Sequence, residues 1–190
     1  MEHGLEWPDP VPPLGTPRLE LRALRREDAA EVATVYADPA ITRFLTLGTM
    51  TSVSDAEAAI NTVLELYAAR RAVRWIIRLR ESGQLIGTVG YLNVSEANLR
   101  AEVSIDLARG EWGAGIAVET GHAVLPFGFK SMQLRRIEAD IHPDNAGSIR
   151  VVEKLGFTYE GLLRDYWFMK GRPESVRRYG LLPGDVDYGE

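Results

Sequence analysis

The spacing of apolar residues in the first third of the chain predicts one strand followed by two helices. Residues 18–24 alternate apolar and polar side chains, which is the period of a half-buried strand. Residues 28–36 then place their apolar side chains on one face of a helix. A second helix, over 54–71, is predicted to begin at a capping box formed by Ser54 and Glu57.

Three strand-like segments follow in close succession. Residues 75–80 and 85–92 are rich in β-branched and aromatic side chains, and the four residues between them include Gly83, which can adopt the positive φ of a hairpin turn. A further turn at 96–99 leads into an alternating segment at 101–107. These three strands are therefore expected to pair as an antiparallel meander.

The second half of the chain alternates between helices and strands. We expect a helix over 115–129, a strand over 136–141, a helix over 145–156 and two strands within 158–182. Pro126 cannot donate a hydrogen bond inside a helix, so it should kink or end the first of these helices. The order of elements predicts an α/β (α+β) fold, in which helices flank a mixed, mostly antiparallel sheet.

The length of 190 residues favours a single domain, which we place at residues 17–182. Residues 1–16 contain four prolines and are expected to form an extended N-terminal arm. Residues 183–190 are expected to form a C-terminal tail.

Composition and charge exclude several classes of function. The 22 basic and 27 acidic residues give a net charge of -5, which argues against a nucleic-acid partner. The chain has no cysteine and three scattered histidines, so we expect neither thiolate chemistry nor a metal site. No apolar run reaches the ~18 residues of a membrane-spanning helix. We therefore expect no membrane partner and a cytoplasmic location.

One segment has the composition of an anion-binding loop. Residues 111–117 lead from a predicted strand through Gly113 and Gly115 into a predicted helix. Glycine lets the backbone approach a ligand closely, and the free N–H groups of a helix's first turn favour a phosphate. The same glycines would also suit any tight turn, and a single G-x-G spacing does not separate the two interpretations.

A series of short motifs runs through the chain in a fixed order. They are T-x-R-L at 16–19, I-G-T-V-G at 86–90, A-E-V at 101–103, W-G-A-G-I-A at 112–117, R-I-E-A at 136–139, H-P-D-N-A-G-S-I-R at 142–150, E-K-L-G-F at 153–157 and E-G-L-L-R at 160–164. In this order and spacing they resemble the GNAT acetyltransferases, and among them the RimJ/RimL-like group that acetylates the N-termini of ribosomal proteins.

The resemblance implies a V-shaped splay in the sheet between the strands at 101–107 and 136–141, into which the pantetheine arm of the co-substrate acetyl-CoA inserts. The diphosphate would lie on the amides of residues 113–117. Where relatives often carry Gln or Arg, three residues before the first loop glycine, this chain has Gly110. The residues implied for coenzyme binding are Ile105, Asp106, Leu107, Trp112, Gly113, Ala114, Gly115, Ile116, Ala117 and Asn145.

The resemblance also implies two catalytic residues. Glu102 would act as the general base, because only a neutral amine has a lone pair for attack on the thioester. Ser148 would act as the general acid that protonates the leaving thiolate. From the residues alone, Glu102 also fits a solvated strand face shared with Ser104 and Asp106. Ser148 likewise fits the first turn of a helix capped by Asn145.

The implied function is transfer of an acetyl group from acetyl-CoA to a primary amine, with the N-terminal α-amine of a protein, such as a ribosomal protein, as the favoured acceptor. An α-amine, with a pKa of about 7.7–8.0, is partly neutral at physiological pH, whereas a lysine amine at about 10.4 is almost wholly charged. A small amine, such as a polyamine, an aminoglycoside or an amino acid, is the alternative acceptor. A catalytically silent acyl-CoA-binding module is the alternative class. We expect a monomer or a homodimer.

Overall fold

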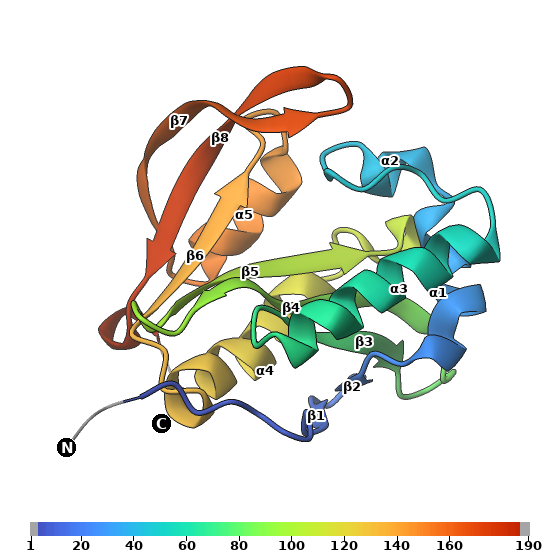
Figure 1. Ribbon diagram of the computed structural model, residues 1–190, viewed down its shortest axis with the longest axis horizontal. Coiled ribbons are helices and arrows are strands. Elements are labelled where there is room, and N and C mark those ends of the chain that lie inside the picture. The colour runs from blue at the N-terminus through green and yellow to red at the C-terminus, as the bar shows by residue number, and fades with distance from the viewer. Residues whose placement is uncertain (1–3, 187–190) are drawn as a thin grey trace.

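An eight-stranded sheet forms the centre of the computed structural model, which describes residues 4–186 (Figure 1). The strands lie in the order β1-β2-β3-β4-β5-β6-β8-β7. Neighbouring strands are antiparallel except β5 and β6, which are parallel. The predicted mixed, mostly antiparallel sheet is therefore confirmed. The strands are β1 (Leu14–Gly15), β2 (Leu19–Ala23), β3 (Val73–Leu79), β4 (Leu85–Ser95), β5 (Arg100–Leu107), β6 (Arg136–Ile141), β7 (Thr158–Met169) and β8 (Arg172–Leu181).

Helices cover both faces of the sheet, so β3 is apolar on both sides. Trp75 and Ile77 belong to the core shared with α4, whereas Ile76 between them packs with α1 and α3. This follows from the alternation of side chains along a strand. The α-helices are α1 (Ala29–Tyr36), α2 (Pro39–Thr42), α3 (Val53–Ala68), α4 (Ile116–Pro126) and α5 (Ala146–Lys154). Shorter turns are η1 (Arg26–Asp28), η2 (Arg109–Glu111), the π-helical η3 (Phe127–Ser131) and η4 (Pro183–Asp185).

The start of α3 differs from the sequence prediction. The amide of Asp55 donates to Ser52 Oγ at 3.2 Å, and the amide of Ser52 donates to Asp55 Oδ2 at 3.0 Å. The capping box is therefore formed by Ser52 and Asp55, and the prediction of Ser54 and Glu57 was wrong. Both pairs have a cap residue followed three positions later by an acid, and the sequence pattern alone did not separate them.

Pro126 ends α4, as expected from its missing N–H group. The chain continues as η3, in which the amide of Met132 donates to the carbonyl of Phe127 at 3.0 Å. Two elements were not predicted: the short strand β1 and the helix α2, which Asp38 caps by accepting from the amide of Ala40 at 2.8 Å.

The N-terminal arm lies against the body of the protein. The rings of Trp7 and Tyr67 are 5.4 Å apart, and Trp75 Nε1 donates to the carbonyl of Pro12 at 2.8 Å. Residues 1–3 of the predicted arm and 187–190 of the predicted tail lie outside the described residues. Across residues 4–186, no helix combines the length and apolarity needed to cross a membrane. Within the same range, no three His, Asp or Glu side chains are grouped to hold a metal ion.

Candidate active site

The sheet splits between β5 and β6, as the motif resemblance implied. The two strands pair only where Arg100, Ala101 and Glu102 lie opposite residues 136–138. Beyond Glu102, β5 continues to Leu107 without a partner on this side, and Figure 1 shows the two strands diverging. The V-shaped splay is therefore confirmed.

The open edge of β5 presents backbone amides to the splay. Ala108 donates its amide to the carbonyl of Ile86, on the β4 side, at 2.7 Å. Successive amides of a strand point alternately to its two sides, so those of Ile105 and Leu107 point toward the splay and that of Asp106 points toward β4. Ile105 and Leu107 thus offer main-chain donors there.

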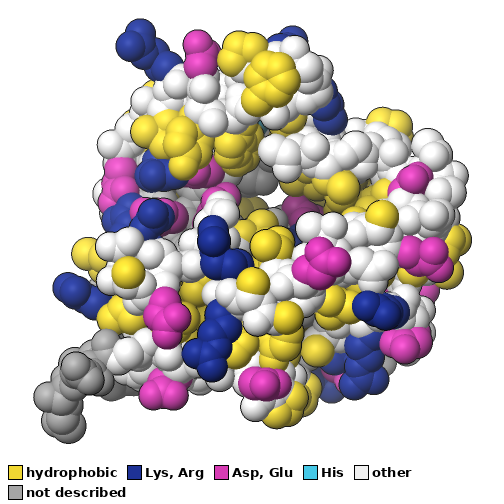
Figure 2. All heavy atoms as spheres, viewed as in Figure 1, with side chains coloured by type: hydrophobic (Ala, Val, Ile, Leu, Met, Phe, Trp, Pro, Cys, Tyr) yellow, Lys and Arg dark blue, Asp and Glu magenta, His cyan; other side chains and the backbone are white. Residues whose placement is uncertain are grey.

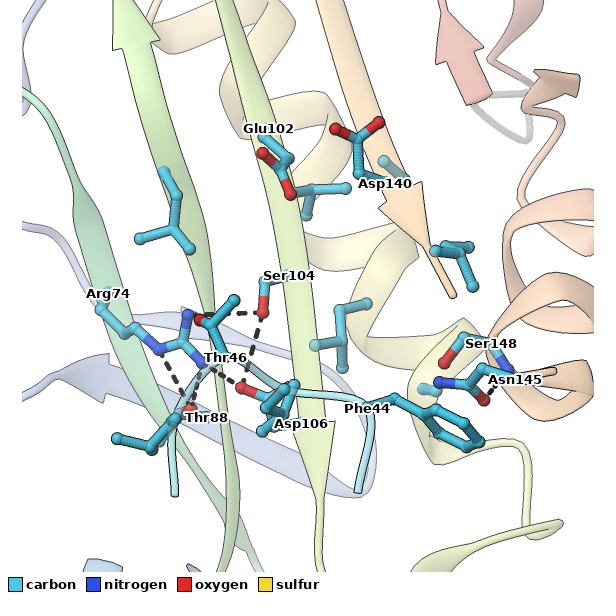
Figure 3. Close-up of a pocket in the computed structure, with 18 of the residues that line it drawn as sticks. Phe44, Thr46, Arg74, Thr88, Glu102, Ser104, Asp106, Asp140, Asn145 and Ser148 are labelled. Carbon is cyan, nitrogen blue, oxygen red and sulfur yellow. Dashed lines mark hydrogen bonds and ion pairs between the residues drawn. The ribbon is translucent and has the colours of Figure 1, made fainter. Parts of the chain in front are cut away.

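A cavity of about 590 Å³ occupies the splay and extends to both faces of the sheet. Figure 2 shows this region as a hollow between the two halves of the molecule. One wall comes from α4 and α5, and the opposite wall comes from α1, α3 and the segment 44–50. The cavity is mostly apolar, and its polar residues lie mainly on strands β3 to β6 and at the start of α5 (Figure 3).

Glu102 lies at the apex of the splay. Its side chain accepts a hydrogen bond from Asn93 Nδ2 at 2.9 Å. Burial raises the pKa of the Glu102 carboxyl to about 7; the Asn93 hydrogen bond lowers it, and the nearby charge of Asp140 raises it further. Both Glu102 and Asn93 also line a second, polar cavity of about 610 Å³, which is bordered by the turn after β4. Glu102 therefore faces two cavities, and near neutral pH its carboxyl group is ionised in part of the molecules and protonated in the rest.

The other polar residues of β5 form a buried network on the cavity floor (Figure 3). Asp106 forms an ion pair with Arg74 of β3, and each side chain is only 10% exposed. Tyr36 of α1 donates to Asp106 Oδ2 at 3.0 Å, and Arg74 Nε donates to Thr88 Oγ1 at 3.1 Å. Asp106, expected to contact the coenzyme, thus uses its side chain within the protein. Arg74, Tyr36 and Thr88 were missed from the sequence because nothing local marks contacts this distant along the chain.

The glycine loop has the geometry of an anion-binding site. Gly113 and Gly115 have φ of 79° and 78°, and α4 begins at the next residue, Ile116. Within the described part of the chain, the amides of residues 113–117 donate no hydrogen bond to another protein group. Trp112 Nε1 donates to the carbonyl of Leu107 at 2.9 Å, which ties the loop to the end of β5. Five amides at the start of a helix are therefore available to a phosphate.

Asn145 and Ser148 line the same cavity from the start of α5 (Figure 3). Asn145 Oδ1 accepts the amide of Ser148 at 3.1 Å, which makes Asn145 the N-cap of the helix. The Ser148 hydroxyl is thus held at the cavity wall by a helix that begins in a fixed place. The structural role of Asn145 and a contact with the coenzyme are compatible.

The cavity is closed above by contacts between the two halves of the molecule. Lys170, at the tip of the β7–β8 hairpin, donates from Nζ to the carbonyls of Thr42 at 2.7 Å and Arg43 at 3.3 Å. The rings of Phe44 and His142 stack with centroids 5.0 Å apart. The sequence carried no signal for this closure, because it joins residues that are more than ninety positions apart.

These features define a class of protein with a splayed strand, a cavity beside it, a glycine loop with free amides and a titratable carboxyl group at the apex. Residues 18–158 match the acetyltransferase (GNAT) domain family. The chain therefore belongs to the GNAT acetyltransferases, and it is an N-acetyltransferase.

Similarity to individual proteins extends over nearly the whole chain. An uncharacterized N-acetyltransferase, p20 of Bacillus licheniformis, is 38% identical over 169 residues, which cover 89% of this chain and 95% of that protein. A spermidine N(1)-acetyltransferase of Vibrio cholerae is 27% identical over 167 residues, covering 87% and 93%. The solved structure of Mycobacterium smegmatis RimJ in complex with CoA-disulfide aligns with a TM-score of 0.77 at 26% identity, covering 91% of this chain and 87% of that one.

Proposed function

We propose that the protein transfers the acetyl group of acetyl-CoA to the N-terminal α-amine of a protein or peptide, with Glu102 as the general base. The observation that carries this proposal is the carboxyl group of Glu102, whose pKa of about 7 places it close to that of an α-amine at the apex of the splay. A base with this pKa is ionised often enough at neutral pH to accept a proton.

The coenzyme would occupy the splay and the glycine loop. The five amides of residues 113–117 would bind the diphosphate, since the positive φ of Gly113 and Gly115 leaves them free. The amides of Ile105 and Leu107 would bind the pantetheine arm, which then directs the thioester toward Glu102. The apolar cavity wall excludes water from the thioester, which limits its hydrolysis.

The reaction begins when Glu102 takes a proton from the ammonium group of the acceptor. The neutral nitrogen attacks the thioester carbonyl and forms a C–N bond, and the carbonyl oxygen becomes an oxyanion that main-chain N–H groups of β5 stabilise. The C–S bond then breaks, and the coenzyme leaves as a thiolate. Ser148 supplies a proton to that sulfur and regains one from solvent, while the second proton of the nitrogen and the proton held by Glu102 are released to solvent.

The pairing of the cavity's carboxylates supports an acceptor with one amine. Among the described residues that line the cavity in the splay, Asp106 is paired with Arg74 and Asp140 with Arg178, so of these carboxylates only Glu102 forms no ion pair. A polyamine would bring further ammonium groups, and each needs an unpaired carboxylate if it is to leave water. An α-amine needs only one.

The pKa values favour the same acceptor. Proton transfer from an α-ammonium group to Glu102 is unfavourable by about one pKa unit, or ~1.4 kcal/mol. Transfer from an alkylammonium group, with a pKa of about 10.4, is unfavourable by about three pKa units or more, which is ~4–5 kcal/mol. The second candidate, a polyamine acceptor, is supported by the 27% identity to the spermidine N(1)-acetyltransferase of Vibrio cholerae.

A turnover screen with acetyl-CoA tests the proposal. The acceptors are a peptide with a free N-terminus, the same peptide with a blocked N-terminus and one internal lysine, spermidine, and an aminoglycoside. Thiol release and product mass are measured. We expect the free N-terminus to be preferred over the internal lysine by roughly 100-fold, from their pKa difference. Faster turnover of spermidine would overturn the peptide acceptor, and coenzyme binding without turnover of any amine would overturn the catalytic role.

A further inference from the structure

The T-x-R-L motif reaches the glycine loop from the other end of the sequence. Arg18 Nη1 donates to the carbonyl of Ala114 at 3.1 Å, and Arg18 Nε donates to Glu119 Oε2 at 2.6 Å. Thr16 Oγ1 and the amide of Arg18 donate to the other oxygen of Glu119. The motif therefore binds the loop and the first turn of α4 at the same time.

The contact with Ala114 fixes the direction of a neighbouring amide. In a trans peptide unit, the C=O group and the following N–H group point in opposite directions. When Arg18 holds the carbonyl of Ala114, the N–H group of Gly115 must point away from Arg18. Gly115 forms one end of this peptide unit and Gly113 precedes the other, and glycine has the widest backbone freedom of any residue, so an external contact is needed to select one orientation.

The contact with Glu119 balances a negative charge that would repel a phosphate. Residues 110–117 contain no basic side chain, and Glu111 and Glu119 place carboxylates at the two ends of the loop. Burial acts to raise the pKa of the Glu119 carboxyl, but the hydrogen bonds from Thr16 and Arg18 outweigh this effect and lower it, so Glu119 stays ionised. The guanidinium of Arg18 is half exposed beside it and balances that charge.

From these contacts we infer that Arg18, supported by Thr16, is a positioning residue for coenzyme binding, which orients the Ala114–Gly115 peptide unit and neutralises Glu119 beside the diphosphate site. The inference rests on the proposed function, because it requires that the diphosphate of acetyl-CoA binds the loop. It assigns a role in the site to the T-x-R-L motif, which lies 95 residues before the loop in the sequence. It also provides a cation near a loop in which Gly110 stands where relatives carry Gln or Arg.

The test compares donors with and without the diphosphate. Arg18→Ala should raise the KM for acetyl-CoA and the Kd for CoA roughly tenfold or more, as expected for the loss of charge-assisted hydrogen bonds. Saturating kcat should change less than about threefold, because Arg18 does not reach the reacting atoms. With S-acetylpantetheine, which lacks the diphosphate, the variant should match the unmodified protein. Arg18→Lys, which keeps the charge, should recover part of the affinity.

Arg78→Ala is a matched control. Arg78 pairs with Glu31 and donates to the carbonyl of Gly83 at 2.6 Å, so it makes the same two kinds of contact as Arg18 at a site away from the loop. This variant should leave the Kd for CoA, measured by calorimetry, unchanged. Thr16→Val provides a milder variant if Arg18→Ala does not fold, and it should weaken CoA binding in the same direction.

Two results would overturn the inference: an unchanged Kd for CoA in Arg18→Ala or Thr16→Val, or an equal loss of activity with both donors. Failure of the proposed function is a separate result, because the unmodified protein would then not bind CoA or would not acetylate any amine.

Discussion

Glu102 combines two properties that conflict in an ordinary surface residue: it is partly buried between two cavities, and its carboxylate forms no ion pair among the described residues. Its hydrogen bond from Asn93 depends on an unusual backbone conformation, because Asn93 has a φ of 50° at an irregularity in the pairing of β4 and β5. Non-glycine residues with positive φ are uncommon and are concentrated at functional sites. The carboxyl group is therefore held in an environment that stability alone would not select.

The kinetic consequence is a pH dependence set by Glu102. In the unmodified protein, kcat/KM should rise about tenfold per pH unit below pH 7 and become less steep above it, because the ionised carboxylate is the active form. Glu102→Gln should lower kcat/KM by roughly 10²- to 10⁴-fold near pH 7, with little change in the Kd for CoA. Glu96→Gln, at a residue that lines only the second, polar cavity, is the control. An unaltered pH profile in Glu102→Gln would remove this residue from the mechanism.

The same group should make the folded state less stable as the pH rises. The folded pKa of Glu102, about 7, lies above the unfolded value, so the folded state binds the proton more tightly, and stability is lost as the pH rises from about 4.5 to 7. Glu102→Gln removes this loss and should be more stable than the unmodified protein at pH 8 by roughly 2 kcal/mol. Urea unfolding at pH 5 and pH 8 measures the difference, and equal stabilities at pH 8 would contradict it.

At the scale of elements, the sequence predicted the helices and strands whose apolar residues recur with a clear periodicity. The meander, the strand before the splay, α4 ending at Pro126 and α5 ending before Gly156 all follow from local patterns. Gly156 has a φ of 86°, and the amides of Gly156 and Phe157 donate back to the carbonyls of Glu153 and Val152, which closes a Schellman motif. β1 and α2 were not predicted because they are two and four residues long and have no period to detect.

The glycine loop allows a comparison of two glycines with the same backbone conformation. Gly113 has a φ of 79° and Gly83 has a φ of 70°, and neither would place a Cβ atom within 4 Å of another group. Alanine at either position should cost about 1 kcal/mol of stability, since both must keep a positive φ. Only Gly113→Ala should weaken CoA binding, because the loop can relieve its strain by turning the amides. Equal CoA affinities in the two variants, by calorimetry, would contradict the loop assignment.

At the scale of the molecule, the two halves of the sheet are joined by three residue pairs and by the closure above the cavity. Lys170 contributes two hydrogen bonds to that closure, and both acceptors are main-chain carbonyls at the end of α2. The segment 44–50 therefore begins directly after residues that a distant hairpin contacts.

Loss of the Lys170 contact should make the segment 44–50 more mobile, and we expect this segment to border the amine acceptor because it lines the cavity. In Lys170→Gln, the amides of residues 43–50 should exchange with solvent roughly tenfold faster, as expected for the loss of a charge-assisted hydrogen bond. The KM for the amine should rise while the Kd for CoA stays constant, and Lys154→Gln, at the end of α5, is the control. Unchanged exchange over 43–50, measured by mass spectrometry, would show that the closure does not depend on Lys170.

The candidate site could be predicted from the sequence only along β5, the loop and the start of α5. These segments carry motifs, which led to Glu102, residues 113–117, Asn145 and Ser148. The structure brings Glu102, Ala117, Asn145 and Ser148 to one cavity, whereas residues 113–116 of the loop do not line it. Partners such as Asn93, Arg74 and Arg178 lie on other strands. Their approach to the site depends on strand pairing, which no local pattern encodes.

The three-residue pairing between β5 and β6 also decides which side chains the splay receives. Glu102 is the last residue in that pairing, and Ala101 and Val103 on either side of it point into the opposite core. A slip of one residue between these strands would exchange the two sets and bury the acid among aliphatic side chains. The alignment of β5 with β6 and the position of the proposed base are thus fixed together, so under the proposed mechanism a substitution distant from Glu102 would abolish catalysis if it shifted the pairing of these two strands.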